Sequence, residues 1–174
     1  EHPIFLCYNF HMISIRINDT GNFMQKLLVD DTFDHFLMCE SEIITSSSFN
    51  LDGRINRDFY DSDELEHIND DFVFWKNIKH ICFEIIKGHK VPKKLRLVFA
   101  LSKTKYNEII EKSGMSISAD DIGGLYLHIT YENGKTEIIT GTSLNTFTMD
   151  KTLDHYWDKS VTAFLSEHFN VEIL

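Results

Sequence analysis

The sequence predicts an α+β fold in which a strand-helix-strands-helix unit occurs twice and forms a mostly antiparallel sheet, with the helices packed on one face. Three observations predict it. Strand-like alternation of apolar residues recurs along the chain, two long segments carry apolar residues at helical spacing, and the same element order appears in about 12–90 and 91–174. With 174 residues, 43% of them hydrophobic, the chain suits one domain of two similar halves over 12–174.

The first half begins with a strand, a short helix and further strands. In MISIRIN the isoleucines alternate with other residues, which is the period of a half-buried strand. Asp19 or Thr20 can cap the helix that follows. HFLMCESEIITSSSFNL is rich in β-formers and predicts one or two strands, with a weak turn near Glu40–Ser41 and the serine run at Ser46 inside a strand.

An acidic segment, DSDELEHINDD at 61–71, predicts a solvated excursion before a long helix. The helix is predicted because apolar residues recur at helical spacing: Phe74, Trp75, Ile78, Ile81, Cys82, Ile85 and Ile86.

The second half restarts the pattern with the alternating strand KLRLVFALS. Ser102 or Thr104 can cap a helix that ends at Gly114, and MSISADDIGG is predicted as a loop. Two alternating strands then flank Asn133-Gly134, the pair that a type I′ hairpin turn favours. The last helix carries one apolar stripe: Leu153, Tyr156, Trp157, Val161, Phe164, Leu165 and Phe169.

A repeated stretch supports the internal duplication. IITSSSFNLD, from Ile43, is echoed by IITGTSLNTFTMD, from Ile138. Trp75 and Trp157 are both expected in the first turn of the helix that closes their half. We interpret the echo as equivalent strands in two copies of one unit rather than as a shared catalytic motif, because its common residues are mostly β-formers and small hydroxyls.

Composition excludes several classes of protein. The net charge of -10 argues against nucleic acid or an anionic membrane as the partner. Cys7, Cys39 and Cys82 form no CxxC pair, which argues against disulfides and structural zinc and favours a reducing cytoplasm. No common hydrolase, nucleotide or metal motif occurs, so no catalytic residue, metal or cofactor is predicted. Residues 1–11, EHPIFLCYNFH, lack signal-peptide features, and we interpret them as a non-native leader, with a native edge strand as the alternative.

Two polar groups are candidates for one ligand-binding site. Asp52 and Arg54 would form its first-half wall, and Asp150, Asp154 and His155 its second-half wall. Carboxylates beside a histidine could serve a metal or acid–base chemistry. Each wall also has a structural alternative. The first-half residues could form a turn with an ion pair, and the second-half acids could complement the positive end of a helix.

A basic run, KGHKVPKKLR, is a candidate patch for an anion or a partner. Its structural alternative is that cations complement the end of a helix and protect a strand edge. The patch comprises Lys87, Lys90, Lys93, Lys94 and Arg96.

From residue 12 onward the chain resembles a family of small uncharacterised proteins of Clostridia-type bacteria, known as a domain of unknown function. The stretches that carry the resemblance are FNLDGRINRDFY, FWKNIKHICFEIIKGHKVPKKLRLVFALS and TGTSLNTFTMDKTLDHYWD. The resemblance implies a bacterial, cytoplasmic protein and brings no known activity.

The sequence therefore favours a non-enzymatic protein-interaction or scaffold domain that binds an unknown protein partner or its own copy through an open sheet face or an edge strand. The alternative is a small-ligand-binding protein or enzyme with a cleft between the halves. Nucleic-acid binding is the third hypothesis, which the net charge disfavours.

Overall fold

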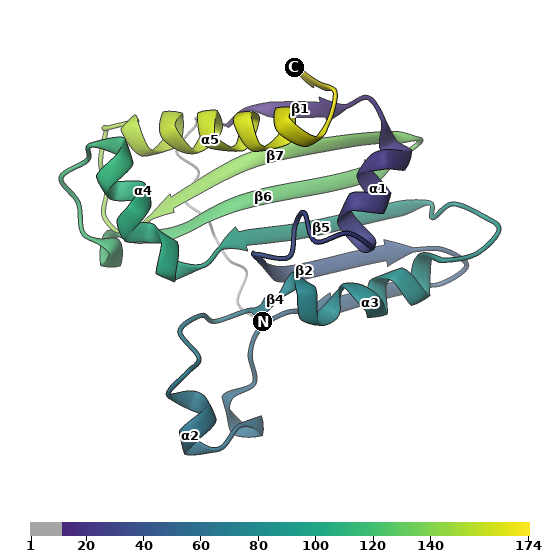
Figure 1. Cartoon of the computed structure of the whole chain (residues 1–174), viewed down its shortest axis with the longest axis horizontal. Helices are drawn as coiled ribbons and strands as arrows, with labels where there is room; N and C mark the ends of the chain where they lie inside the picture. The colour runs from purple at the N-terminus through teal and green to yellow at the C-terminus, as the bar shows by residue number, and fades with distance from the viewer. Residues whose placement is uncertain (1–11) are drawn as a thin grey trace.

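The computed structural model describes residues 12–174, which form one antiparallel sheet with helices on one of its faces (Figure 1). The sheet has eight strands in the order β3-β2-β5-β6-β7-β1-β8, and β4 also pairs with β2. The predicted α+β fold with an antiparallel sheet is thus confirmed. The leader at residues 1–11 and Cys7 lie outside the described residues. The strands are β1 (Ser14–Ile17), β2 (Phe36–Ile44), β3 (Ser48–Asp52), β4 (Val73–Phe74), β5 (Lys94–Leu101), β6 (Ile122–Glu132), β7 (Lys135–Leu144) and β8 (Val171–Ile173).

Helices α1, α3 and α5 lie across one face of the sheet, whereas α2 stands away from it (Figure 1). Helix α4 packs against α5. Within residues 12–174 no helix is long and apolar enough to cross a membrane. The helices are α1 (Thr20–Leu28), α2 (Ser62–Leu65), α3 (Trp75–Ile86), α4 (Tyr106–Ser113) and α5 (Thr152–His168), with short 3-10 turns η1 (Arg57–Phe59), η2 (Lys103–Lys105) and η3 (Ala119–Asp121).

The core lies between the helices and the sheet, and β6 shows how the sequence builds it. Leu125, Leu127 and Ile129 are fully buried among core residues, and the positions between them are only half-buried on the opposite face. This two-residue period is what a strand with one covered face requires. The turn between β6 and β7 is also as predicted, because Asn133 and Gly134 both adopt positive φ, at 53° and 76°.

The first hairpin differs from the prediction in its turn. The turn occupies residues 45–47, so Ser46 and Ser47 lie in the turn and Ser48 opens β3, instead of the whole run lying within a strand. Near Glu40–Ser41, where a weak turn was predicted, β2 continues with a register shift between Met38 and Glu40. A β-bulge disturbs the alternation without reversing the chain, and this explains the weak signal.

The acidic excursion is solvated only in part. Helix α2 has no buried residue, but Asp70, at the end of the segment, is only 5% exposed. Its carboxylate accepts hydrogen bonds from the Ser102 hydroxyl at 2.7 Å and the Lys103 backbone N–H at 2.9 Å. A buried carboxylate thus fastens the excursion to the end of β5.

The structure does not show the predicted internal duplication. Strand β5 pairs with β6, the next strand of its own half, whereas β1 pairs with β7 and β8 rather than with β2. The echoed stretches also differ, because the one from Ile43 spans the β2–β3 turn and the one from Ile138 runs from within β7 into a loop. Trp75 opens α3, but Trp157 lies in the second turn of α5. Shared β-forming composition predicts strands, not equivalent pairing.

Candidate functional site

The first predicted wall, Asp52 and Arg54, forms a closed local turn at the end of β3. Asp52 Oδ1 accepts a hydrogen bond from the Arg54 backbone N–H at 2.9 Å. The Arg54 guanidinium lies 5.1 Å from the centre of the Phe72 ring, a distance suited to a cation–π contact. Asp52 and Arg54 thus each have a partner within the first half of the chain.

The second predicted wall divides between the surface and the interior. Asp150 is exposed and accepts hydrogen bonds from the backbone N–H and hydroxyl of Thr152 at 2.9 and 2.6 Å, which lower the pKa of its carboxyl group. Asp154 is 4% exposed and accepts a hydrogen bond from the Thr142 hydroxyl on β7. His155 is exposed on the outside of α5. Asp150 and Asp154 therefore hold the start of α5 in place, whereas His155 lies at an exposed position of the helix.

The sheet order keeps the two walls apart. Asp52 ends β3, whereas Asp150 lies in the loop between β7 and α5. Strands β2, β5 and β6 lie between β3 and β7, and four strand spacings of about 4.8 Å make roughly 19 Å between the elements that carry the two residues. The structure therefore does not bring Asp52 and Asp150 together. Within residues 12–174 there is also no group of three or more His, Cys, Asp or Glu side chains that could hold a metal ion.

The predicted basic patch is largely paired with carboxylates. Lys94 Nζ lies 2.9 Å from Glu42 and Arg96 Nη2 lies 2.7 Å from Glu40, on neighbouring strands β5 and β2. Lys87 pairs with Glu84 one helical turn away, at 2.5 Å. Lys90 and Lys93 are exposed in the loop before β5. The run is thus divided between a loop and an ion-pair ladder on the sheet.

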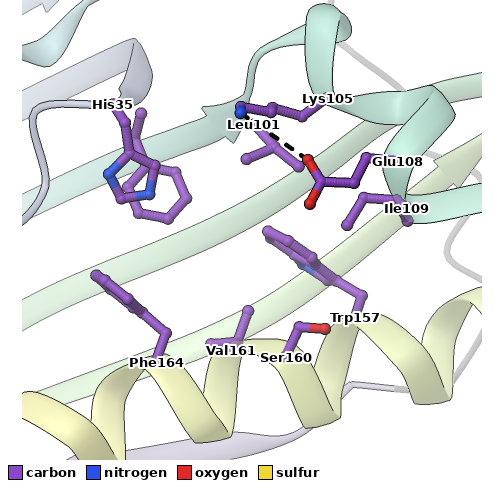
Figure 2. Close-up of a pocket in the computed structure, with 10 residues that line it drawn as sticks. His35, Leu101, Lys105, Glu108, Ile109, Trp157, Ser160, Val161 and Phe164 are labelled. Carbon is purple, nitrogen blue, oxygen red and sulfur yellow. Dashed lines mark ion pairs between the residues drawn. The ribbon is translucent and has the colours of Figure 1, made fainter. Parts of the chain in front are cut away.

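A pocket of about 270 Å³ opens between α4, α5 and the ends of β2 and β5 (Figure 2). Its residues come from segments that are far apart in the chain and that the fold brings together. They are His35, Phe36, Leu101, Lys105, Glu108, Ile109, Trp157, Ser160, Val161 and Phe164.

The apolar part of the pocket is held firmly. Phe36, Leu101 and Val161 are buried core residues. The Trp157 indole N–H donates to the Tyr126 carbonyl oxygen at 3.0 Å, which fixes the ring in place. A ligand would therefore meet a preformed apolar surface.

His35 and Phe164 form one end of the pocket. The His35 ring lies 4.2 Å from the Phe36 ring and 5.7 Å, edge to face, from the Phe164 ring. Burial lowers the pKa of His35, and the charge of Lys105 lowers it further, against the opposite effect of Asp34. The imidazole is therefore neutral near neutral pH and able to donate or accept a hydrogen bond.

Lys105 and Glu108 stand at the rim as a loose ion pair. Lys105 Nζ lies 3.9 Å from Glu108 Oε2, beyond hydrogen-bond distance. Glu108 Oε1 instead accepts a hydrogen bond from Lys112 Nζ at 2.5 Å, and Lys112 is the main cause of the lowered Glu108 pKa. The carboxylate is thus committed to Lys112, and the Lys105 ammonium keeps hydrogen-bonding capacity.

Sequence reasoning missed this pocket because no local motif describes it. Trp157, Val161 and Phe164 were predicted correctly as the apolar stripe of the last helix, but a stripe does not show where the core leaves a hollow. The histidines of the chain show no metal-ligand spacing, so nothing in the sequence singles out His35. The site forms where α4 packs against α5, with η2 in contact with α4.

The fold and the pocket together define an α+β protein with an eight-stranded antiparallel sheet and a small apolar hollow beside its helices. The chain belongs to the family of unknown function DUF5721, whose model matches residues 26–171. This agrees with the resemblance to a domain of unknown function and assigns no role to any residue. Neither the curated proteins nor the solved structures give a match to this chain.

Proposed function

We propose that the protein is a non-enzymatic binding domain that holds a small ligand in the pocket between α4 and α5. One observation carries the proposal: the pocket combines a rigid apolar surface with polar groups that retain hydrogen-bonding capacity at its rim. Concave, mostly apolar sites with a few polar groups are typical of small-molecule binding. This develops the alternative hypothesis from the sequence, with different residues.

Binding rather than catalysis is proposed because the polar pocket residues do not form a reactive pair. The Ser160 hydroxyl donates to the Tyr156 carbonyl oxygen within α5, at 2.8 Å, and is therefore not activated by His35. A nucleophile needs a base within hydrogen-bond reach. The arrangement favours recognition of a ligand without chemical change.

The test is a thermal-shift screen with small organic compounds. A ligand at a hundred times its Kd stabilises the protein by about 2.7 kcal/mol. Ser160→Phe fills the pocket, whereas Lys159→Phe puts the same side chain on a neighbouring exposed position of α5. We expect hits that Ser160→Phe abolishes and Lys159→Phe retains. Hits that survive Ser160→Phe, or no hits at all, would refute the proposal.

A second candidate, the interaction function favoured by the sequence, rests on strand β3. Among residues 12–174 no strand pairs with its outer edge. The segment Ser48–Asp52 contains no Lys, Arg or Pro, and its Phe49 is 38% exposed. Edge strands without such protection are templates for pairing with another chain.

Self-association through β3 is tested by light scattering over a range of protein concentrations. We expect a dimer that Phe49→Lys dissociates, because a charged residue opposes pairing at an edge. A protein that stays monomeric at every concentration would exclude the homodimer, and the partner of β3 would then have to be a different protein. Nucleic-acid binding is not favoured, because Lys94 and Arg96 are paired with carboxylates.

The cellular setting that we propose is a reducing bacterial cytoplasm. It is supported by Cys39 and Cys82, which are free thiols in half-buried and buried positions.

A further inference from the structure

We infer that the pocket takes a small organic anion, with a carboxylate beside Lys105 and an apolar body against Trp157 and Phe164. The inference rests on the proposed ligand-binding function and names the chemical class of the ligand. It is carried by the charges at the rim, the free hydrogen-bonding capacity of two side chains, and the size of the hollow.

The rim favours an anion because the Glu108 carboxylate already has a partner in Lys112, which leaves the Lys105 ammonium available to a ligand. Glu108 binds Lys112 at 2.5 Å and lies 3.9 Å from Lys105. Lys105 makes no hydrogen bond to residues 12–174 through its side chain, and 59% of that side chain is exposed. Lys105 can therefore turn toward a ligand carboxylate without losing a close internal partner.

His35 supplies a second donor at the opening. Figure 2 shows its ring and the Lys105 side chain on the same side of the hollow, facing the side chains of α5. The ring nitrogens of His35 make no hydrogen bond within the described part of the chain, although the ring is held against Phe36. A neutral imidazole N–H can donate to a carboxylate oxygen that Lys105 also binds.

The rest of the hollow suits a compact apolar body. Trp157 and Phe164 offer aromatic surfaces, above buried Leu101 and Val161. The volume of about 270 Å³ falls below the roughly 300–1,000 Å³ of sites for drug-sized ligands. A monocyclic aromatic acid, or a short aliphatic acid, fits this description better than a nucleotide or a peptide.

Three probes of nearly equal size isolate the charge: phenylacetate, phenylacetamide and 2-phenylethylamine. Trp157 reports on binding through its fluorescence, because it lines the pocket whereas Trp75 is fully buried in the core. We expect phenylacetate to bind about tenfold more tightly than the amide, a factor that corresponds to about 1.4 kcal/mol. The amine should bind most weakly, because Lys105 repels it.

Variants then test whether Lys105 is the source of the preference. Lys105→Met should reduce the preference for phenylacetate over the amide to within about twofold and leave amide binding unchanged. Lys103→Met is the matched control, since Lys103 lies in the same 3-10 turn but pairs with Asp71 outside the pocket. Glu108→Gln should tighten phenylacetate binding by removing a nearby negative charge.

The outcomes separate this inference from the proposed function. If the thermal-shift screen finds pocket ligands but neutral or cationic probes bind as well as phenylacetate, the ligand is not an anion and only the inference fails. The same holds if Lys105→Met and Lys103→Met have equal effects. If neither the screen nor any probe shows pocket binding, the proposed function fails as well.

Discussion

The substitution Asp70→Ala should destabilise the protein far more than the same change at the next residue. Asp70 is 5% exposed and accepts hydrogen bonds from the Ser102 hydroxyl and the Lys103 backbone N–H. Alanine leaves that N–H without its acceptor, whereas the Ser102 hydroxyl still has Thr104 Oγ1 at 2.9 Å. The substitution therefore removes the acceptor of the Lys103 backbone N–H completely and weakens the hydrogen bonding of the Ser102 hydroxyl only in part.

The expected magnitude follows from these two bonds. A hydrogen bond to a charged group contributes about 1.5–3 kcal/mol, so we expect the free energy of unfolding to fall by about 2–4 kcal/mol. For a domain of this size each kcal/mol lowers the Tm by about 2–4 °C, which makes a decrease of roughly 5–15 °C.

Asp71→Ala is the internal comparison. The Asp71 side chain is 46% exposed and forms ion pairs with Lys103 at 2.7 Å and Arg57 at 3.6 Å. Lys103 is the main cause of its lowered pKa, but exposed ion pairs contribute only about 0–1 kcal/mol. Two adjacent aspartates should thus differ by several-fold in their effect on stability.

The assay is urea denaturation followed by tryptophan fluorescence, with the midpoint and the m value fitted for each variant. An unchanged m value would show that the difference lies in the folded contacts. Equal effects of the two substitutions, or a loss of less than about 1 kcal/mol at Asp70, would refute the assignment of this carboxylate as the anchor of the excursion.

Three further predictions follow from the same contacts. Gly53→Ala places a Cβ 1.7 Å from a carbonyl oxygen of β2 and should abolish folding. Gly21→Ala lies in the first turn of α1, where the added Cβ would meet only Asp19 Oδ1, at an ordinary contact distance of 3.7 Å, and should stabilise by about 0.5–1 kcal/mol in chemical denaturation. Burial is the main cause of the lowered pKa of His35 and of His128, so near the unfolded pKa of about 6.5 the unfolded chain binds more protons than the folded protein. Stability should therefore be lost as the pH falls below about 6.5 toward the folded pKa values. A variant with glutamine at both positions should flatten a plot of Tm against pH. Burial raises the pKa of the Cys82 thiol to about 11, so mass spectrometry should find it unmodified by iodoacetamide in the native protein and modified in urea.

Local signals were enough to predict the elements whose cause is local. The Asn133-Gly134 turn needs positive φ at both positions, and few residue pairs other than this one supply it. The long helices follow from their apolar stripes. By contrast, β8 (Val171–Ile173) was missed, because three residues are too few to show a period and the strand exists only through its pairing with β1.

The candidate site lay beyond sequence reasoning for a different reason. Charge density drew the prediction to Asp150 and Asp154, yet one accepts a hydrogen bond from the first backbone N–H of α5 and the other fastens that helix to β7. The burial of Asp70 could not be predicted either, because the high charge of the run around it is typical of a solvated segment. The pocket is the space left between the side chains of α4 and those of α5. The size of that space is set by tertiary packing rather than by any stretch of sequence.

The pairing of β1 with β7 also determines when this part of the sheet can form during synthesis. Arg16 on β1 bonds Glu137 on β7, a partner 121 residues further along the chain. At roughly 5–20 residues per second, a ribosome needs on the order of ten seconds to supply that partner. Until then the isoleucines of β1 have no sheet to join, so this edge is completed late, and contacts at such separation slow folding in general. A nascent chain that exposes this strand is the state in which a chaperone would be most useful.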